Sequence, residues 1–541
     1  MATSRSDRRG RAASYRASLR KDAPPFRRIL IANRGEIAVR IIRACRDLGV
    51  EAVSVYSDAD ASAAHVRMAD SSVRLGPPPP AESYLRIDAI VEAAVSSGAE
   101  AVHPGYGFLA ERAAFAGAVE AAGLVFIGPR PAAIEALGDK LRARRLAREV
   151  GVPTVPGTLE PAPVDRPDQV DAIIEVARGV GFPLLVKAAA GGGGRGMRRV
   201  TSERELPAAL AAGSHEALSA FGDGTVYIER EISPARHVEV QLLGDSTGRV
   251  VAIGERDCSL QRRHQKLVEE APAPGLTPAR RRKLHAMAAQ LGTAAGLSNA
   301  ATCEFLLAPD GSFAFLEVNT RLQVEHGVTE LVTGLDIVAE QLSLAAGRPL
   351  SGAVLAAAER AADPGRHTIE VRLSAEDPAR DFAPTPGTVR RWRMPSGPGV
   401  RVDTAISEGD RVPPDYDNLI AKLMVDGSDR DQAIDRLRRA LDEAEIGGVQ
   451  TTLPFHRFVA RSSAFRAAEL STGWVEQHWD GATDRERARG VALLAVALAD
   501  RGESDNLARP GTDGLASPTP RAGAGGWRRA ALDAEVDRWP R

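Results

Sequence analysis

The chain has 541 residues, of which 44% are hydrophobic and 26% charged, and its formal net charge at pH 7 is −1. This length predicts several domains, and the balanced charge argues against a general affinity for nucleic acid or for a membrane surface. The three cysteines, Cys45, Cys258 and Cys303, lack the C-x-x-C spacing of a zinc or redox site. Because the sequence also lacks a membrane-spanning run and a secretory signal, we expect a cytoplasmic protein in a reducing compartment.

The two ends of the chain differ in composition from its middle. Residues 1–25 are rich in Arg, Ser and Ala, and we expect a disordered N-terminal extension there rather than an organelle transit peptide. Residues 480–541 begin with a helix-prone stretch and continue as GESDNLARPGTDGLASPTPRAGAGG. The Gly, Pro and Ser content of that segment predicts a disordered tail.

Residues 26–138 alternate between apolar strands and amphipathic helices. The run RRILIA predicts a strand, NRGEIAVRIIRACRDLG a helix with Asn33 near its start and Gly49 past its end, and VEAVSVY a second strand. This βαβ alternation predicts a doubly wound parallel sheet. Only one glycine, Gly35, lies in the first turn, so the G-x-G-x-x-G fingerprint is absent and NAD binding is not inferred.

The stretch KAAAGGGGRGM, from Lys187 to Met197, combines glycines with a cation on either side. Glycines let backbone N–H groups approach a phosphate closely, but the lysine precedes the glycines, which is the reverse of a Walker loop. The flanking runs FPLLVK and GMRRV predict strands, so we expect the glycines at a mobile hairpin tip that covers phosphates. A plain flexible turn is the alternative.

The segment CEFLLAPDGSFAFLEVN predicts an antiparallel hairpin centred between Asp310 and Gly311. Symmetry about this centre places Glu304 opposite Glu317, and facing carboxylates repel, so a cation is expected between them. Asn319 shares the face of Glu317, and these three oxygen donors suit magnesium. A solvent-facing acidic hairpin, or a register slipped by one residue, would remove this site. Neutralising one carboxylate is expected to relieve repulsion.

The same alternation carries past the hairpin and predicts one polar face formed by Glu317, Asn319, Arg321, Gln323 and Glu325. An arginine there suits a small planar anion such as bicarbonate, with Glu325 placed to take its proton. A salt-bridged turn is the alternative. Residues 360–470 predict a mixed α/β section with strands in HTIEVRLSAE and LIAKLMV and one helix in RDQAIDRLRRALDEAEIGG.

Six motifs together resemble biotin carboxylase, an ATP-grasp enzyme: ANRGEIAVRIIRACRDLG, HPGYGFLAE, KAAAGGGGRGM, ERDCSLQRRHQK, LEVNTRLQVEH and YDNLIAKL. The resemblance spans about residues 26–470 and implies an α/β and α+β multidomain fold. It implies an N-terminal domain at 26–138, an ATP-grasp domain at 139–345 with a glycine-rich lid at about 155–228, and a C-terminal domain at 360–470. The tail at 480–541 lies outside it.

The resemblance also assigns roles to individual residues. For ATP it implies contacts from Lys140, Lys187, Gly193, Gly194, Glu229, Arg230, Glu231, Ile232, His237, Gln261 and His264. For Mg²⁺, or Mn²⁺, it implies the ligands Glu304, Glu317 and Asn319. For bicarbonate and catalysis it implies Lys266, Arg321, Gln323, Val324 and Glu325, and for the enolate-like oxygen of biotin it implies Arg372.

The implied reaction is the first half of an acetyl-CoA or acyl-CoA carboxylase, used in fatty acid biosynthesis. Bicarbonate, deprotonated by Glu325, would attack the γ-phosphate of ATP to give carboxyphosphate, which supplies carbon dioxide to biotin. No methionine in the sequence is followed by lysine, so we expect the biotin on a separate carrier protein. Carboxyltransferase subunits and a homodimer are the other partners that the resemblance implies.

Two other functions fit part of the pattern. One is a different ATP-grasp ligase that activates a carboxylate, such as a carbamoyl-phosphate synthetase-like enzyme. The other is a silent nucleotide-binding regulatory subunit, whose mark would be the loss of a catalytic or metal residue; Glu304, Glu317, Arg321 and Glu325 are all present. The sequence departs from the family pattern at Ala190, Arg230 and Gly327, and Gly327 is expected to loosen the turn that holds Glu325.

Overall fold

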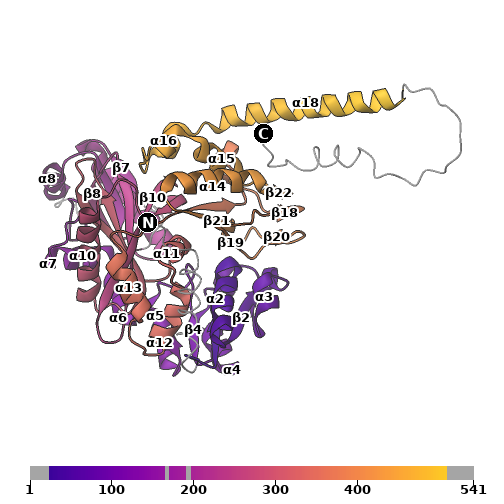
Figure 1. The fold of residues 1–541 in the computed structure, drawn as a ribbon. Coiled ribbons are helices and arrows are strands. Elements are labelled where there is room, and N and C mark those ends of the chain that lie inside the picture. The colour runs from indigo at the N-terminus through magenta and orange to yellow at the C-terminus, as the bar shows by residue number, and fades with distance from the viewer. Residues whose placement is uncertain (1–23, 165–169, 191–196, 508–541) are drawn as a thin grey trace, which may run out of the picture.

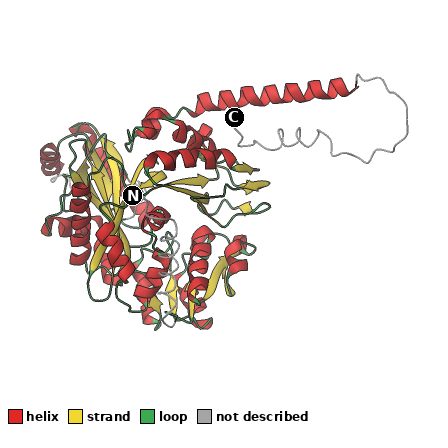
Figure 2. Ribbon diagram, in the orientation of Figure 1, coloured by secondary structure: helices red, strands yellow, loops and turns green. Residues whose placement is uncertain are grey.

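A computed structural model gives the positions of residues 24–164, 170–190 and 197–507 (Figure 1). The expected disordered extension at 1–25 lies outside these ranges except for its last two residues, and residues 508–541 of the expected tail lie outside them as well. Strands gather in the interior and helices cover them, as the colouring by secondary structure shows (Figure 2).

The N-terminal part is a five-stranded parallel sheet in the order β3-β2-β1-β4-β5, which confirms the predicted doubly wound arrangement. Alternate residues of β1 enter different cores, because Ile29 and Ile31 pack with α2 while Leu30 packs with α4 and α5 on the other face. Its strands are β1 (Arg28–Ile31), β2 (Glu51–Ser57), β3 (Ser71–Gly76), β4 (Ala101–His103) and β5 (Val125–Phe126). Its helices are α2 (Gly35–Leu48), α3 (Ala64–Met68), α4 (Ile87–Ser96), α5 (Ala113–Ala121) and α6 (Pro131–Gly138).

Helix α2 ends where the sequence predicts. Gly49 follows its last residue with φ of 73°, and its N–H donates to the carbonyl of Arg46, so the glycine closes the helix in the left-handed conformation. This cap turns the chain directly into β2, whose first residue Glu51 pairs with Arg28.

A small three-stranded antiparallel sheet carries the glycine stretch. Strand β6 (Leu184–Ala188) lies between β7 (Arg198–Val200) and β8 (Val226–Arg230), and β6 and β7 pair as the predicted hairpin. Helices α8 (Val170–Val180) and α9 (Leu206–Phe221) cover this sheet and share its apolar core. The hairpin tip at 191–196, with Gly193 and Gly194, lies outside the described residues.

The centre of the molecule is an eight-stranded sheet in the order β13-β12-β9-β10-β11-β14-β21-β19, with every neighbouring pair antiparallel. Its strands are β9 (Arg236–Gly244), β10 (Val250–Arg262), β11 (Gln265–Ala271), β12 (Asn299–Leu307), β13 (Phe313–Asn319), β14 (His367–Ser374), β19 (Val400–Thr404) and β21 (Leu419–Gly427). The section at 360–470 therefore contributes three strands to the sheet that also carries the predicted magnesium hairpin.

Helices surround this central sheet. They are α7 (Lys140–Glu149), α10 (Pro278–Ala294), α11 (His326–Thr333), α12 (Ile337–Ala345), α13 (Gly352–Arg360), α14 (Arg430–Glu443), α15 (Leu453–Arg461), α16 (Ser463–Arg466) and α17 (Trp474–His478). The prediction of one helix in 360–470 was wrong, because α15 and α16 follow α14 there. The short strands β15 (Glu376–Asp377), β16 (Ala383–Pro384), β17 (Gly387–Thr388), β18 (Arg391–Arg393), β20 (Arg411–Val412) and β22 (Glu445–Gly447) form two-stranded pairs.

The predicted hairpin forms, but its register is not symmetric throughout. Glu304 pairs with Glu317 as predicted, whereas Phe305 pairs with Phe315 where symmetry would select Leu316. A β-bulge between Glu304 and Phe305 accounts for the difference, since it inserts one extra residue into β13. The bulge brings the two glutamates opposite each other.

Helix α18 (Gly481–Leu507) extends away from the rest of the molecule (Figure 1). It continues through residues 502–507, which the composition assigned to the disordered tail. None of the helices that the structure describes is long and apolar enough to cross a membrane.

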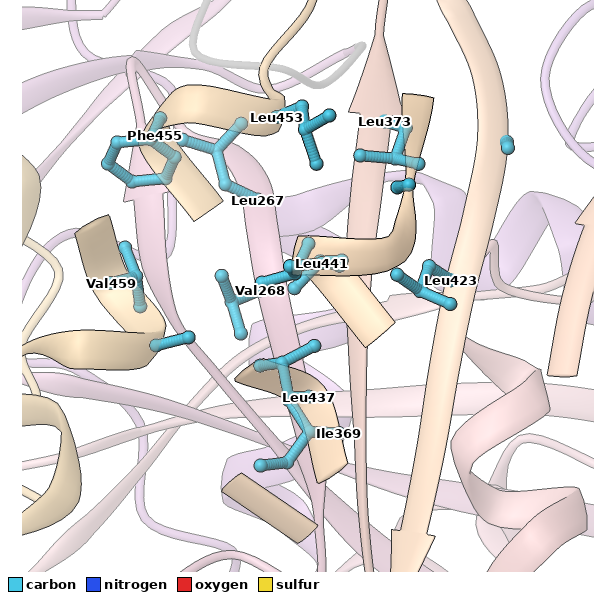
Figure 3. Close-up of a cluster of buried hydrophobic side chains, with 14 of the residues drawn as sticks. Leu267, Val268, Ile369, Leu373, Leu423, Leu437, Leu441, Leu453, Phe455 and Val459 are labelled. Carbon is cyan, nitrogen blue, oxygen red and sulfur yellow. The ribbon is translucent and has the colours of Figure 1, made fainter. Parts of the chain in front are cut away.

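The largest apolar core lies between the central sheet and the helices α14 and α15 (Figure 3). Leu437 of α14 is buried with 0% of its surface exposed, beside Ile369 of β14 and Val268 of β11. This core fixes the strands that carry several of the functional side chains described below.

We predict that Leu437→Ala lowers the free energy of unfolding by about 2–5 kcal/mol, because it removes buried apolar contacts and leaves a cavity. Leu218→Ala is the matched control, since Leu218 of α9 is 56% exposed and its loss should change stability by less than about 0.5 kcal/mol. Urea unfolding followed by circular dichroism measures both changes. Equal losses in the two variants would contradict this description of the core.

Candidate active site

A row of charged residues crosses four neighbouring strands of the central sheet. Glu317 of β13 lies opposite Glu304 of β12, which lies opposite Glu239 of β9, which lies opposite Arg256 of β10. Side chains that face each other in this way lie on the same side of a sheet, and adjacent carboxylates repel. Glu304 and Glu239 are buried, so water cannot screen the repulsion and a cation is required.

Lys266 of β11 is that cation. Its ammonium donates to Glu304 at 2.9 Å and to Glu325 at 2.7 Å, and it also bonds Glu239. Only 11% of the side chain is exposed. Burial alone would lower the pKa of Lys266, but the three carboxylates raise it well above its usual value, so the ammonium stays charged.

Glu304 collects further donors around it. His237 Nε2 lies 3.0 Å from its carboxylate, and the amides of Asn319 and Gln323 donate to it at 2.9 and 3.2 Å. Burial opposes ionisation of Glu304, but the charges of Lys266 and His237 lower its pKa far below the usual range. Four residues predicted to act on phosphate, metal or bicarbonate thus meet in one cluster with His237, which was predicted to contact the nucleotide.

The residues after Asn319 form a loop at 320–325, so the prediction that strand alternation continues to Glu325 was wrong. Strand β13 ends at Asn319, and α11 begins at His326. The polar side chains nevertheless converge, because Arg321 donates to Asn319 at 3.0 Å and to Gln323 at 2.9 Å. Hydrogen bonds within the loop therefore bring together the side chains that the alternation pattern had placed on one strand face.

Glu325 lies at the N-terminal end of α11 and has 0% of its surface exposed. Its two oxygens bind different cations, Lys266 at 2.7 Å and Arg372 at 2.9 Å. Burial would raise the pKa of Glu325, but Lys266, Arg372 and Arg256 hold it well below the usual range. The carboxylate is therefore ionised at neutral pH.

Three carboxylates of this site were missed by the sequence analysis. Glu269 accepts from Arg372 at 2.6 Å, Glu239 binds Lys266, and Glu111 accepts from Arg321 at 2.8 Å and from the Thr320 N–H at 3.2 Å. Strand alternation could have identified Glu239, which is two residues from His237 in β9. Glu111 lies about two hundred residues from Arg321 in sequence, and no local pattern connects them.

The predicted phosphate lysines lie at the other end of the row. Lys140, the first residue of α7, lies 3.1 Å from Glu317, and Lys187 of β6 donates to buried Glu229 at 2.8 Å. Glu229 also binds Arg144 of α7. The hydroxyl of Tyr227 is buried near these lysines and has no hydrogen-bond partner among the described residues. Such an orphaned polar group fits a site that receives a polar ligand.

The remaining predicted residues lie in several different elements. His264 lies in the two-residue turn between β10 and β11, where Arg263 and His264 have φ of 49° and 64°, in the left-handed region that non-glycine residues adopt uncommonly. Gln261 is buried beside this turn. Arg230, Glu231, Ile232 and Val324 are more exposed, and Glu231 bonds Arg199.

Gly327, which departs from the family pattern, lies in the first turn of α11. A Cβ atom there would collide with Met424 of β21, whose sulfur occupies the space beside the glycine. The small residue in α11 and the long one in β21 are therefore matched in volume, and the turn after Glu325 is packed.

The donor set fits a divalent cation. Glu304 and Glu317 face each other on adjacent strands, so two hard oxygen donors lie together, while Asn319 donates its side-chain N–H to Glu304 and accepts from Arg321 with its oxygen. Lys266 and Lys140 neutralise the same two carboxylates. The site therefore combines oxygen ligands for a metal with ammonium groups for phosphate oxygens.

We predict that Glu304→Gln lowers the free energy of unfolding at pH 7 by about 3 kcal/mol, because it leaves Lys266 and His237 short of a buried partner. These contacts reverse the sequence-based expectation that neutralisation relieves repulsion. The folded pKa of Glu304 lies below its unfolded value, so its stabilisation is present above the unfolded pKa and is lost on acidification.

Glu317, with 25% of its side chain exposed, is the control, and Glu317→Gln should cost less than about 1 kcal/mol. Thermal midpoints across pH decide; an equal cost at pH 7 and pH 4 contradicts the prediction.

Comparison with protein families assigns all three sections of the chain. Residues 25–134 match the biotin carboxylase N-terminal domain, residues 139–353 match the ATP binding domain of the carbamoyl-phosphate synthase L chain, and residues 370–477 match the biotin carboxylase C-terminal domain. The first and third models are named for biotin carboxylase, while the ATP-binding model is named for a different enzyme.

Individual relatives agree with the family models. The biotin carboxylase of Pseudomonas aeruginosa is 46% identical over 83% of this chain and 98% of its own, and a pyruvate carboxylase subunit of Methanothermobacter thermautotrophicus is 47% identical over 84% and 91%. A biotin carboxylase structure from Campylobacter jejuni matches with a TM-score of 0.80 and 41% identity, covering 84% of this chain and 99% of that one. The biotin carboxylase domain dimer of the Hydrogenobacter thermophilus 2-oxoglutarate carboxylase, solved with MgADP, ADP and bicarbonate, has a TM-score of 0.79 and 42% identity over 84% and 98%. This chain belongs to the biotin carboxylase family.

Proposed function

We propose that this chain carboxylates biotin with ATP and bicarbonate, and that it is the biotin carboxylase component of an acyl-CoA carboxylase. The observation that carries the proposal is the convergence of Lys266, Arg321 and Glu325 beside the predicted magnesium ligands. Glu325, as a proton acceptor, and the cations Lys266 and Arg321 then surround the space where bicarbonate and the γ-phosphate must meet. An ATPase assay that requires both bicarbonate and biotin tests the activity.

In this proposal Lys140, Lys187 and His264 bind the phosphates of ATP, and His237, Gln261 and the residues 229–232 bind its adenine and ribose. Glu304, Glu317 and Asn319 would hold magnesium, which would neutralise phosphate charge. Gly193 and Gly194 belong to the expected phosphate loop, which lies outside the described residues. Tyr227, with its orphaned hydroxyl, is a further candidate for contact with the nucleotide.

Bicarbonate would bind between Arg321 and Lys266, with Gln323 and Val324 fixing its orientation. Arg321 presents a planar fork of donors, which matches a carboxylate-like anion. Its guanidinium is held by Glu111, Asn319 and Gln323, so it needs little reorganisation when the anion arrives.

Glu325 is the proposed general base for bicarbonate. Its low pKa in the free protein makes it a weak base, but the same cations that lower this pKa are those that the anion would approach. Bicarbonate bound next to Lys266 would partly neutralise the ammonium charge that lowers the pKa of Glu325. The pKa of Glu325 should therefore rise as the substrate binds. The residue would thus become more basic only when a proton is available to accept.

Arg372 is placed for the second step, in which the ureido nitrogen of biotin loses a proton and negative charge develops on the ureido oxygen. Burial would lower the pKa of Arg372, but Glu269 and Glu325 raise it, so the guanidinium remains a fixed cation. A preorganised cation of this kind stabilises the developing charge without reorganisation of solvent.

The partners follow from the chemistry. Biotin would arrive on a carrier protein, because no methionine of these 541 residues precedes a lysine as in biotin acceptor hairpins. Carboxyltransferase subunits would use the carboxybiotin that the site produces. A homodimer in the cytoplasm is the proposed assembly, and the related domain from Hydrogenobacter thermophilus was solved as a dimer.

A carbamoyl-phosphate synthetase-like ligase is the alternative that the ATP-binding model favours. The flanking matches to both biotin carboxylase domains, and the position of Arg372 beside Glu325, favour biotin over ammonia as the acceptor. ATP hydrolysis that responds to bicarbonate and ammonia but not to biotin would reverse this choice.

We predict that Glu325→Gln slows biotin carboxylation about a hundred- to ten-thousand-fold while ATP binds with nearly unchanged affinity, because glutamine keeps the shape but cannot accept a proton. Steady-state kinetics with varied bicarbonate measure the effect, and equilibrium binding of ATP is the control. A raised bicarbonate KM with unchanged kcat would show that Glu325 binds the substrate and is not the base.

We predict a different defect for Arg321→Ala. Its loss removes the proposed anion clamp and leaves Glu111 without its ion-pair partner, so the bicarbonate KM should rise and kcat should fall together. Glu111→Gln is the matched control, since it weakens the support of Arg321 and keeps the clamp. A larger rise in KM for Glu111→Gln than for Arg321→Ala would contradict the proposed role of Arg321.

We predict that Glu317→Gln raises the magnesium concentration needed for half-maximal activity, because it replaces a charged ligand by a neutral one. Lys140 also loses its ion-pair partner in this variant, so ATP affinity at saturating magnesium is measured as the control. Wild-type activity across the whole magnesium titration would refute the assignment of Glu317 as a ligand.

A further inference from the structure

Three residues from separate sequence motifs have no role in the chemistry above. Glu36 belongs to ANRGE, Tyr106 to HPGYGF and Lys422 to NLIAKL, and they come from α2, from the loop after β4 and from β21. In the structure Glu36 joins the other two, because it accepts from the Tyr106 hydroxyl and lies 3.2 Å from the ammonium of Lys422.

Lys422 extends from this group to the 320–325 loop. Its ammonium donates to the backbone carbonyl of Val324 at 2.9 Å, and Val324 directly precedes Glu325. The next carbonyl back, that of Gln323, lies 2.8 Å from the Nδ1 of His326. The backbone on the N-terminal side of Glu325 is therefore held at two consecutive carbonyls.

The register of the central sheet explains why Lys422 reaches this position. Lys422 of β21 lies directly opposite Arg372 of β14, so the two cations lie on the same face. Arg372 binds the carboxylate of Glu325 at 2.9 Å, and Lys422 binds the carbonyl of the residue before it. Two neighbouring strands thus hold the side chain and the backbone of the same short segment.

Burial of the Lys422 ammonium costs free energy, which nearby carboxylates must offset. The Lys422 side chain has 0% of its surface exposed and lies opposite a second cation, Arg372, which is unfavourable without compensation. The carboxylates of Glu36, at 3.2 Å, and Asp403, at 4.0 Å, supply that compensation. Burial would lower the pKa of Lys422, but Glu36, Glu370 and Asp403 raise it, so the donor keeps its protons.

We propose that Lys422 is a positioning residue for Glu325: it holds the Val324 carbonyl so that the carboxylate of Glu325 faces the bicarbonate site. Glu36 and Tyr106 act through Lys422 by fixing its ammonium from the N-terminal section. This inference rests on the proposed role of Glu325 as the base, and it adds a residue that contacts no substrate.

The test compares Lys422→Met with the wild-type chain, alone and combined with Glu325→Gln. Lys422→Met should lower kcat about ten- to a hundredfold with little change in the KM of ATP, because a shift of about 1 Å in a catalytic group has effects of this size. In the Glu325→Gln background the same change should lower kcat less than about threefold, since the group it positions is already gone.

Arg457→Met is the matched control. Arg457 of α15 is also a buried cation that holds backbone carbonyls, but those of Leu441 and Ala444, at the C-terminal end of α14. Its loss should destabilise the protein and leave kcat unchanged within about twofold. A fall in kcat equal to that of Lys422→Met would assign the effect to general loss of stability and overturn the positioning role.

A second readout needs no substrate. Amide hydrogen exchange of residues 322–326 in the nucleotide-free protein should become faster in Lys422→Met and stay unchanged in Arg457→Met. If Lys422→Met alone does not fold, Lys422→Met with Glu36→Gln removes the carboxylate that the first change leaves unpaired, and the same kinetic and exchange effects are expected.

The outcomes distinguish the role of Lys422 from that of Glu325. Near wild-type activity of Glu325→Gln alone would overturn the role of Glu325 as the base. A strong defect in Glu325→Gln together with an equal further loss from Lys422→Met in both backgrounds would overturn the positioning role and leave Glu325 as the base. Unchanged kcat and unchanged exchange in a folded Lys422 variant would also overturn it.

Discussion

The ammonium of Lys266 is the interaction on which the site depends. Three neighbouring strands present Glu317, Glu304 and Glu239 on one face of the sheet, and Glu325 approaches from the loop above. These carboxylates cannot be buried together unless a cation lies among them. Lys266 contacts three of them and remains charged because of them, so the stability of this part of the sheet and the ionisation of the proposed base have the same cause.

The sequence predicts the strands, the facing glutamates and the family, because each depends on local patterns. Strand alternation and the Pro-Asp-Gly turn predicted the hairpin, but they did not predict the bulge at Glu304. The contacts of Arg321 with Glu111, and of Lys422 with Val324, join residues about two hundred and one hundred positions apart. Local periodicity carries no information on such pairs, and they depend on how three sections pack together.

The error at residues 320–325 has a physical reason. Strand alternation placed Arg321, Gln323 and Glu325 on one face, and the structure also brings them together, but through a loop whose side chains bond one another. In a continued strand, Glu325 would have been part of β13, at the edge of the sheet. The loop instead ends on the first turn of α11, where Glu325 is close to both Lys266 and Arg372.

The continuous sheet explains how residues from opposite ends of the chain can act on one small anion. Glu304 on β12 and Arg372 on β14 belong to sections that the sequence treats as separate, yet β9, β10 and β11 join them without a break. The distance between Glu304, a proposed metal ligand, and Arg372 is therefore set by hydrogen-bonded strands and not by a hinge between domains. Motion needed for substrate entry then has to come from elements outside this sheet, and the glycine-bearing hairpin is attached to a separate three-stranded sheet. The architecture keeps Glu304, Lys266 and Arg372 in fixed relation, whereas Lys187, one of the lysines proposed to bind the nucleotide phosphates, lies in strand β6 of the separate sheet.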